Sequence, residues 1–419
     1  MPIHRTEYDS GLRVVTERMP GVRSVALGVW VLAGSRDEPP PISGSSHFLE
    51  HLLFKGTKTR SARDIAEAFD AVGGDVNAFT AKEYTCFYSR IRDRDLPMAV
   101  EHLADMLQSS VIRTADVDGE RQVILEEINM HEDTPDELIH DIFNETLWPD
   151  HPLGRPILGT SGSIRAATRD QIKRFYRKHY EPKDFVVVAA GNVQHEWLLD
   201  LIQANVDAGR VRSEGPSNWK LRAVGTAPVP SGRTDVRRRK TEQAHIVIGT
   251  NGVSRSDPDR FALGIVNNAL GGGMSSRLFQ EVREKRGLAY SVYSYHTMYV
   301  DAGLFSAYAG TTPGRAKDVL ELIREQLADV AEGGLAEDEF ERAKGHMKGS
   351  LVLSLDDPSG RMSRLGKSEL SHGEILTVNQ ILQRIEHVTL DDARTVAKRV
   401  LSQPMSLAVI GPFDRAAFR

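Results

Sequence analysis

The feature that most constrains the fold is an internal repeat, in which the second half of the chain matches the first at an offset of about 220 residues. Four pairs of segments match in the same order: 26–30 with 246–250, 114–121 with 335–342, the helix entries at Thr168 and Thr389, and the apolar strands 185–191 and 406–411. This order predicts two homologous domains from an internal duplication, which we place at 1–210 and 240–419.

Within each half, strands rich in Val and Ile alternate with amphipathic helices such as 96–107 and 317–330. Hairpin-like turns indicate antiparallel pairing, so we predict an α+β fold, each domain a mixed or antiparallel sheet packed with helices. Residues 211–239, rich in Gly, Pro and Ser, are expected to form a linker. The basic run 237–240 has no interleaved aromatic residue, so we interpret it as a solvated strand entrance.

The composition excludes several classes of function. The chain has 419 residues with 53 Lys and Arg against 58 Asp and Glu, a balance that argues against nucleic acid as a partner. It lacks an apolar run of about 18 residues and the features of a secretory signal, so we expect no membrane partner and a cytoplasmic location. Cys86 is the only cysteine. Any metal must therefore be held by His, Asp and Glu.

A histidine pair with metal-ligand spacing follows a serine-rich stretch. Ser45 or Ser46 is expected to cap a helix, which places His47 and His51 about 40° apart around the axis and about 6 Å apart along it. Two imidazoles so placed can converge on one cation, and Glu50 lies within reach of a metal-bound water. His-x-x-Glu-His is the motif of inverted zinc peptidases. The alternative is two partly buried helix histidines beside a surface glutamate.

A third ligand is expected on a second helix. Glu120 and Glu127 fall on one face of it, and we interpret this face as the inward apolar stripe because Val123, Ile124 and Met130 lie close to it. Carboxylates on such a stripe require a cation or strong donors. Glu127 is thus the candidate ligand and Glu120 the candidate partner of a ligand imidazole. The alternative is two glutamates whose carboxylates reach solvent at the helix edge.

Three segments together resemble the signatures of the M16 (pitrilysin/insulinase) zinc metallopeptidases: HFLEHLLFKGT at 47–57, ERQVILEEI at 120–128 and RLFQEVREKRGLAY at 277–290. The chain is most similar to the mitochondrial-processing-peptidase-like (M16B) branch, over essentially its whole length. The resemblance implies Zn²⁺ bound by His47, His51 and Glu127, with Glu50 as the base and Glu120 as the supporting acid. It also implies a clamshell in which two such domains, or two such chains, enclose a chamber.

The repeat indicates that only one half is catalytic. A shift of 220 residues carries the histidine pair onto 267–271, which contains no ligand, and a shift of 221 carries Glu127 onto Lys348. We therefore expect 1–210 to be the zinc-binding catalytic domain and 240–419 to be its inactive homologue.

The resemblance also assigns residues to the substrate. The strand with Asn77 and Ala78 is expected to pair with a peptide as an added strand, with an ordinary hairpin as the alternative. Phe54 is expected to line the pocket for the side chain after the cleaved bond, with core packing as the alternative. Glu137 and Asp141 are expected to receive an arginine near that bond. A capping box formed with Thr134 explains Glu137 equally well.

Arg283 and Tyr290 match the arginine and tyrosine that, in the family, reach across the chamber to the substrate near the zinc. An Arg donor and a phenol hydroxyl suit a peptide carbonyl or a developing oxyanion. A helix-surface arginine and a strand aromatic are the alternative. The glycines at 271–273 resemble a loop near the chamber mouth, and they do not form a phosphate loop because no Lys-Ser/Thr follows them.

These observations predict a zinc-dependent endopeptidase that hydrolyses peptides or unfolded protein segments inside an enclosed chamber. Because one chain supplies half of a clamshell, we expect a homodimer in which each active site is completed by the partner's second half. Two alternatives remain: a non-catalytic scaffold or substrate-binding subunit of the same fold, and a presequence-processing subunit that requires a distinct partner chain.

Overall fold

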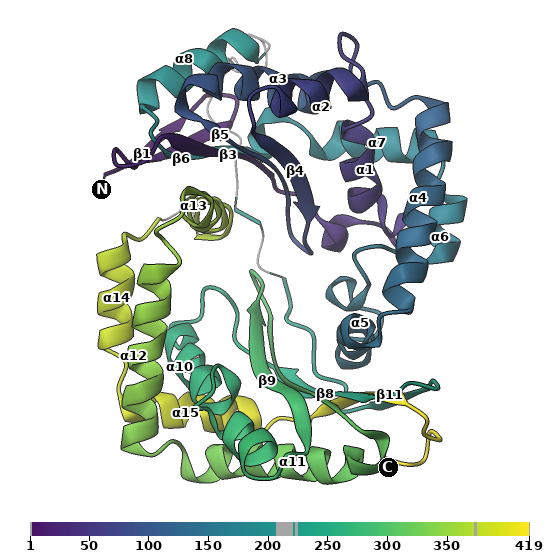
Figure 1. Cartoon of the computed structure of the whole chain (residues 1–419), viewed down its shortest axis with the longest axis vertical. Coiled ribbons are helices and arrows are strands. Elements are labelled where there is room, and N and C mark those ends of the chain that lie inside the picture. The colour runs from purple at the N-terminus through teal and green to yellow at the C-terminus, as the bar shows by residue number, and fades with distance from the viewer. Residues whose placement is uncertain (1, 207–220, 223–224, 373–374, 419) are drawn as a thin grey trace. The chain divides into compact units, whose positions relative to one another are not determined.

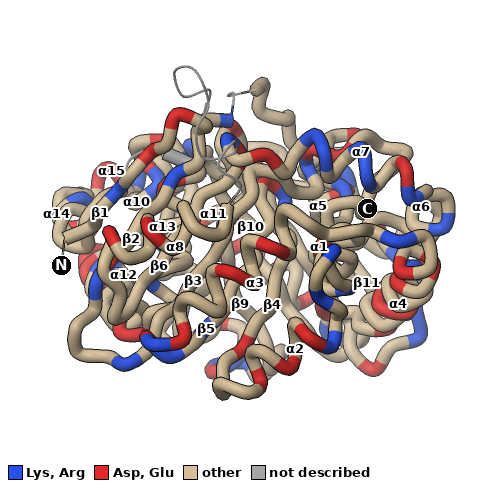
Figure 2. The backbone as a smooth tube through the Cα atoms, turned by 90° about the horizontal axis from the view of Figure 1, so that it is seen from above, with Lys and Arg blue, Asp and Glu red and all other residues tan. Residues whose placement is uncertain are grey.

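The computed structural model describes residues 2–206, 221–222, 225–372 and 375–418, and it divides into two compact units (Figure 1). Acidic and basic residues are interspersed along the backbone of both (Figure 2). No helix among the described residues is long and apolar enough to cross a membrane. The first unit contains Met1–Asn129, Pro156–Arg222 and Ser354–Leu376, and the second contains Met130–Arg155, Ala223–Leu353 and Thr377–Arg419.

A six-stranded sheet forms the centre of the first unit. In spatial order its strands are β1 (Ile3–Glu7), β2 (Arg13–Arg18), β6 (Phe185–Gly191), β3 (Ser24–Val31), β5 (Thr85–Arg92) and β4 (Asp75–Thr80). β2 and β6 are parallel, and the other neighbouring pairs are antiparallel. The central strand β6 is buried along its whole length, as its continuous Val- and Ala-rich sequence predicts. β4 lies at the edge of the sheet.

Helices from the first half of the chain cover one face of this sheet. They are α1 (Ser45–Leu53), α2 (Ala62–Asp70), α3 (Leu96–Ser109), α4 (Thr114–Glu132), α6 (Ser161–Ala166), α7 (Arg169–His179) and α8 (His195–Asn205). Leu27 and Val29 of the sheet belong to one buried core with Phe48 of α1, Leu103 of α3 and Ile124 of α4. The helices that carry the His-x-x-Glu-His motif and the candidate third ligand are therefore anchored in the same core.

The opposite face is covered by α13 (Pro358–His372), a helix from the second half of the chain (Figure 1). Its Gly366 touches Trp30 of β3, because a Cβ at this position would lie 2.2 Å from Cε2 of the indole. The Nε1–H group of Trp30 also donates a hydrogen bond to Sδ of Met362, at 3.3 Å. The absence of a side chain at Gly366 thus allows the helix to approach the sheet closely.

Buried ion pairs attach α13 to β2. Glu369 is fully buried and contacts the equally buried Arg13 at 3.3 Å, while Arg5 reaches it from the surface at 3.0 Å. A second set joins Glu17 to α13: Arg361 lies 2.5 Å and Arg364 lies 3.0 Å from its carboxylate oxygens. A charge buried in this way is tolerated only with its partner present. These pairs therefore specify how α13 lies on the sheet.

The second unit repeats this sheet without the first strand. Its spatial order is β7 (Thr234–Arg238), β11 (Ser406–Gly411), β8 (Ala244–Asn251), β10 (Gly303–Thr311) and β9 (Ala289–Met298). β7 and β11 are parallel, and the remaining pairs are antiparallel. This is the order and direction of β2, β6, β3, β5 and β4. The α+β fold expected from the duplication is therefore confirmed.

The helices of the second unit are also divided between the two faces of its sheet. One face packs against α10 (Arg260–Gly271), α11 (Ala316–Gly333), α12 (Glu337–Leu353), α14 (Val378–Glu386) and α15 (Leu390–Leu401). The other face packs against α5 (Pro135–Leu147), whose Ile139, Phe143 and Leu147 belong to one buried cluster with Val247 and Ile410 of the sheet. α5 belongs to the first half of the chain, so each half contributes one helix to the unit formed by the other.

This exchange corrects the expected boundaries of 1–210 and 240–419, which treated each domain as one continuous segment. Segments 130–155 and 354–376 belong to the opposite units. The expected linker at 211–239 is too long, because β7 begins at Thr234. Residues 211–220 and 223–224 of that linker lie outside the described residues. An amphipathic helix can be recognised from its sequence, but the sheet that it covers cannot.

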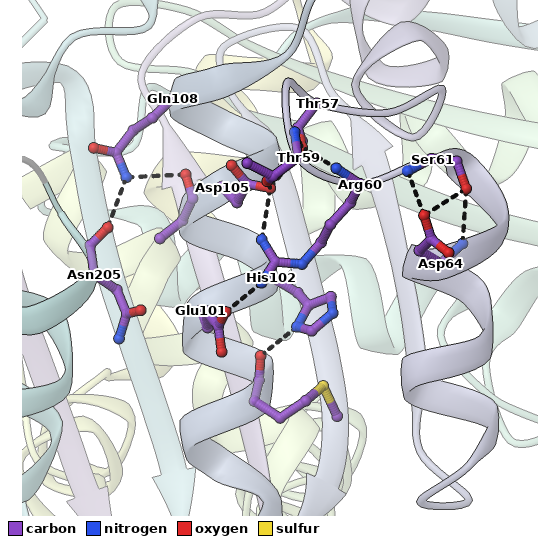
Figure 3. A network of polar contacts seen from close by, with 12 residues as sticks. Thr57, Thr59, Arg60, Ser61, Asp64, Glu101, His102, Asp105, Gln108 and Asn205 are labelled. Carbon is purple, nitrogen blue, oxygen red and sulfur yellow. Dashed lines mark hydrogen bonds and ion pairs between the residues drawn. The ribbon is translucent and has the colours of Figure 1, made fainter.

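A polar network ties the segment after α1 to α3 (Figure 3). The hydroxyl of Thr57 donates to Oδ2 of Asp105 at 2.6 Å, and Nη1 of Arg60 donates to the same oxygen at 2.8 Å. Arg60 also pairs with Glu101 of α3. Immediately afterwards, Ser61 caps α2 through the N–H of Asp64. The segment that follows α1 is therefore attached to α3 by these side-chain contacts.

We predict that Glu369→Gln lowers the free energy of unfolding by about 3–5 kcal/mol, because it leaves the buried Arg13 without a carboxylate. Equilibrium urea denaturation measures the change. The control is Glu7→Gln, which removes a surface partner of Arg5 and should cost less than about 1 kcal/mol. The double variant Arg13→Met with Glu369→Met should recover much of the lost stability. Equal losses for Glu369→Gln and Glu7→Gln would contradict a stabilising role of the buried pair.

Candidate metal centre

Helix α1 does not begin with the expected serine cap. Its N-cap residue is Gly44, and the buried carboxylate of Glu38 accepts hydrogen bonds from the backbone N–H groups of Gly44 and Ser46, each at 2.6 Å. The hydroxyl of Ser45 instead donates to the carbonyl of Ile42. A carboxylate at a helix N-terminus satisfies free donors and interacts favourably with the helix dipole. Glu38, to which no motif points, therefore fixes where the ligand-bearing helix begins.

His47, His51 and Glu127 converge as the spacing predicted. Nε2 of His47 lies 3.5 Å from one carboxylate oxygen of Glu127, and Nε2 of His51 lies 3.5 Å from the other. The potential ligand atoms of all three residues lie within 4.8 Å of one another. Tetrahedral Zn²⁺ with bonds of about 2.0–2.1 Å places its ligand atoms about 3.3 Å apart. These donors therefore fit such an ion, with a position left for a further ligand.

The orientation of helix α4 differs in part from the expected one. Val123 and Met130 are 49% and 71% exposed, so the prediction that they belong to the inward stripe is wrong. The buried face centres on Ile124 and Ile128, and Glu127 lies at its border. The expected stripe was centred on Glu127 itself. At the border, the carboxylate can reach both imidazoles while its side chain stays 41% exposed.

Glu120 is placed behind one of the two histidines. Its Oε2 lies 3.0 Å from Nδ1 of His51, and Nζ of Lys55 lies 2.6 Å from its other oxygen. An acceptor at Nδ1 keeps the proton there and directs the lone pair of Nε2 toward Glu127. Nδ1 of His47, in contrast, is buried without a hydrogen-bond partner among the described residues. Only one of the two imidazoles is therefore oriented by a carboxylate.

The two histidines differ in their electrostatic environments. Burial lowers the pKa of His47 well below its usual value, which favours the neutral imidazole that can bind a metal. Burial also opposes the charged form of His51, but the carboxylates of Glu127 and Glu120 outweigh it and raise the pKa of that ring. Two carboxylates held against a histidine pair make the cluster a favourable place for a cation.

Glu50 lies on the same helix but is not one of the three residues whose potential ligand atoms converge. Burial raises the pKa of its carboxyl group, partly opposed by a hydrogen bond from the hydroxyl of Thr80 at 2.5 Å. Thr80 is the last residue of the edge strand β4. It was not expected from the sequence, because a threonine that ends a strand gives no signal of a partner on a distant helix.

The residues expected to hold a peptide lie on or beside this part of the first unit. Asn77 is exposed on β4, which forms the edge of the sheet, and Ala78 is buried beside it. Phe54 caps the C-terminus of α1, and its ring lies 6.2 Å from that of Phe87, against the core of the unit. This packing is consistent with the core-packing alternative, and the partial exposure of Phe54 leaves part of its ring accessible to a substrate side chain.

Glu137 and Asp141 form an acidic cluster that already holds a histidine. Nε2 of His131 lies 3.0 Å from Asp141 and its Nδ1 lies 3.7 Å from Glu137, and the bond to Asp141 raises the pKa of this ring. The alternative capping box is not formed, because the side chain of Thr134 donates to the carbonyl of Met130 instead. A substrate arginine that binds here would compete with His131 for these carboxylates.

Arg283 and Tyr290 belong to the second unit and contact each other. The guanidinium of Arg283 lies 4.6 Å from the centre of the Tyr290 ring, and its Nη1 donates to the backbone carbonyl of the same residue at 3.1 Å. The ring of Phe279 lies on the guanidinium as well, at 4.7 Å. Tyr290 is 78% exposed. The pair is thus ordered by its own contacts and leaves the tyrosine accessible.

The corresponding helices of the second unit carry no such site. Residues 267–271 form the end of α10, which packs against α12, and Lys348 of α12 pairs with Glu386 at 2.5 Å. Gly271 lies so close to β9 that a Cβ would be 2.1 Å from the backbone nitrogen of Ser294. This glycine therefore has a packing role besides any role in a loop.

Two family models match the chain in succession. Insulinase (Peptidase family M16) matches residues 13–161, and the Peptidase M16 inactive domain matches residues 166–347. A protein of Streptomyces coelicolor named as an uncharacterized zinc protease is 52% identical over 419 residues, which are 100% of this chain and 91% of that protein. A Bacillus subtilis protein named in the same way is 41% identical over 412 residues, which are 98% of each chain.

Solved structures share the fold at lower identity. A peptidase M16 inactive domain from Pseudomonas fluorescens gives a TM-score of 0.88 at 21% identity, covering 99% of this chain and 98% of that one. A protease from Helicobacter pylori gives a TM-score of 0.88 at 23% identity, covering 98% of this chain and 99% of that one. The assignment to the M16B branch stays a prediction. Over nearly its whole length, this chain belongs to the M16 (insulinase) peptidase family.

Proposed function

We propose that the chain is a zinc-dependent endopeptidase that hydrolyses peptides or unfolded protein segments. The observation that carries the proposal is the convergence of His47, His51 and Glu127, with the carboxyl group of Glu50 on the same helix turn. Relatives that are 41% and 52% identical are named as zinc proteases, which supports Zn²⁺ as the ion.

When bound, Zn²⁺ would polarise the peptide carbonyl and lower the pKa of a water to about 7. Glu50 takes a proton from the attacking water and delivers it to the nitrogen of the breaking C–N bond. Its burial suits both transfers, because a carboxyl group with a raised pKa gives up its proton closer to neutral pH. The hydrogen bond from Thr80 holds one oxygen of Glu50 and leaves the other for the proton.

The edge strand β4 supports a peptide substrate over a small molecule. Asn77 and Ala78 lie on the strand that ends at Thr80, so a peptide added to this edge would run past the residue that holds the base. Backbone pairing binds an extended chain with little demand on its sequence. A non-catalytic subunit of this fold has no use for the base, whereas this chain carries all three donors and Glu50.

We propose further that the protein acts as a homodimer, with Arg283 and Tyr290 of one protomer completing the site of its partner. Their own contacts hold the guanidinium and leave the tyrosine accessible. A positioned Arg donor and a phenol hydroxyl suit a substrate carbonyl. Because both sets of residues are on one chain, no distinct partner chain is required.

The roles of Glu50 and Glu127 can be separated by metal content. We predict that Glu50→Gln retains zinc but lowers kcat by about 10²–10⁴-fold, because the amide cannot accept a proton. Glu127→Gln should instead lose zinc, because a neutral amide is a poor ligand. Elemental analysis and cleavage of an unstructured peptide give the two readouts.

Glu126→Gln, on the exposed side of the same helix, is the control. Full activity of Glu50→Gln would exclude the mechanism, and unchanged zinc in Glu127→Gln would exclude that ligand.

We expect Thr80→Val to lower kcat about tenfold with KM and zinc content unchanged, since a lost hydrogen bond of about 1.4 kcal/mol acts only on the orientation of Glu50. Thr80→Ser keeps the hydroxyl group and should restore the rate. A rise in KM in both variants would indicate that position 80 binds the peptide instead of positioning the base.

Completion of the site by a partner can be tested by mixing inactive variants. If Arg283 acts in the partner's site, co-refolded Glu50→Gln and Arg283→Ala chains should regain about a quarter of the wild-type activity, through mixed dimers with one intact site. Glu50→Gln mixed with Glu127→Gln should regain none, because both defects lie in the same half. No recovery in the first mixture would show that each chain completes its own site.

A further inference from the structure

β7 is the edge strand of the second sheet, and its only strand neighbour among the described residues is β11. The carbonyl of Arg233 accepts from the N–H of Leu407, and the N–H of Arg239 donates to the carbonyl of Gly411. The N–H and C=O groups of one residue point to the same side of a strand, and the side alternates with each residue. Odd-numbered residues of β7 therefore pair with β11, and Thr234, Val236 and Arg238 direct their backbone groups away from the sheet.

A groove of about 680 Å³ runs along this edge. Its lining consists of four consecutive residues of β7 and one residue after β11: Thr234, Asp235, Val236, Arg237 and Arg415. No backbone hydrogen bond to the outward groups of β7 is formed within the described part of the chain. The edge is thus an open row of donors and acceptors beside a space, which is what an added strand requires.

The charge at this edge is predominantly positive. The cationic residues of the strand and its surroundings are Arg233, Arg237, Arg238, Arg239, Lys240 and Arg415. The acids that form ion pairs with them are Asp235 and Glu145, at 2.7 and 3.4 Å from Arg237, and Asp414, at 2.6 Å from Arg238. Arg233, Lys240 and Arg415 form no ion pair with any described residue. Cations therefore outnumber acids along the groove, although the whole chain has a net charge of −5.

The chemistry of the groove distinguishes among possible occupants. A single-stranded nucleic acid requires aromatic side chains on which bases stack, and no aromatic residue lines this groove. A second copy that paired edge to edge through β7 would place these cations against one another. An extended peptide with acidic side chains satisfies both the outward backbone groups and the unpaired cations.

We propose that the outer edge of β7, together with Arg415, is a docking groove for an extended acidic peptide segment, which adds to the second sheet as a further strand. The groove is distinct from the candidate metal centre, which belongs to the other unit. Binding of a peptide segment in this groove would therefore not depend on its cleavage at the metal centre.

The test measures binding to the full-length Glu50→Gln protein, in which a peptide stays intact. The probe is a fluorescein-labelled peptide of alternating Glu and Val, followed by fluorescence anisotropy. Arg233→Glu combined with Arg415→Glu should weaken binding about tenfold or more, and added salt should weaken binding to the unaltered groove. The matched control, Arg63→Glu with Arg315→Glu, reverses two exposed arginines elsewhere and should leave the affinity unchanged.

A second pair of variants tests the backbone pairing. Thr234→Pro removes one outward N–H group at the first residue of an edge strand, where proline is tolerated, and should weaken binding severalfold. Thr234→Ala keeps the N–H group and should bind as the parent does. Equal affinities for these two variants, no effect of the charge reversals, or equal binding of a Lys-Val peptide or an oligonucleotide would each overturn the proposal. Because zinc and turnover are not measured, failure here leaves the proposed peptidase activity unaffected.

Discussion

Each sheet of this protein is apolar on both faces. The rest of the structure follows from the requirement that helices cover both of these faces. In the first unit, alternate residues of β3 and β6 point into the core under α1, α3 and α8, and the others point at α13. The second sheet is covered in the same way, with α5 in the place of α13. Both covering helices come from the opposite half of the chain. Neither half could therefore bury its own sheet completely, and the two compact units depend on each other through the chain.

The helices that carry the metal centre are packed on one face of the first sheet, which holds them in place. Helix α1 is buried along one side, capped by Glu38 at its start, and followed by a segment that is tied to α3 through Asp105. Such support matters because ligand atoms must be held within a fraction of an ångström to bind a metal well. Polar groups inside a protein are costly unless they are paired. Glu120 lies against His51 and Lys55, and Thr80 donates to Glu50, while Nδ1 of His47 has no hydrogen-bond partner among the described residues.

The duplication shows that the fold and the chemistry are separable. The helix pair α1 and α4 of the first unit corresponds to α10 and α12 of the second, and both pairs belong to the cores beneath their sheets. In the second unit, the positions of the ligands carry an asparagine, a glycine and a lysine. Gly271, at one of these positions, packs closely against the backbone of Ser294, so no side chain fits there. The scaffold thus tolerates the loss of every donor, because the apolar faces and not the metal ligands hold the helices in place.

The sequence by itself determined the elements, the duplication and the histidine pair with Glu50 beside it, because these depend on periodicity within one helix or on a repeat within the chain. The i, i+4 spacing of His47 and His51 is local. Glu127 was expected on an inward stripe with Val123 and Met130, but both of these residues are exposed, so tertiary packing decided the orientation of α4. Only the tertiary structure decided that α5 and α13 exchange units, that Glu38 caps α1, that Thr80 holds Glu50 and that His131 occupies the acidic cluster. These contacts join residues from different elements, and a pattern of side chains along one element does not specify which partner packs against it.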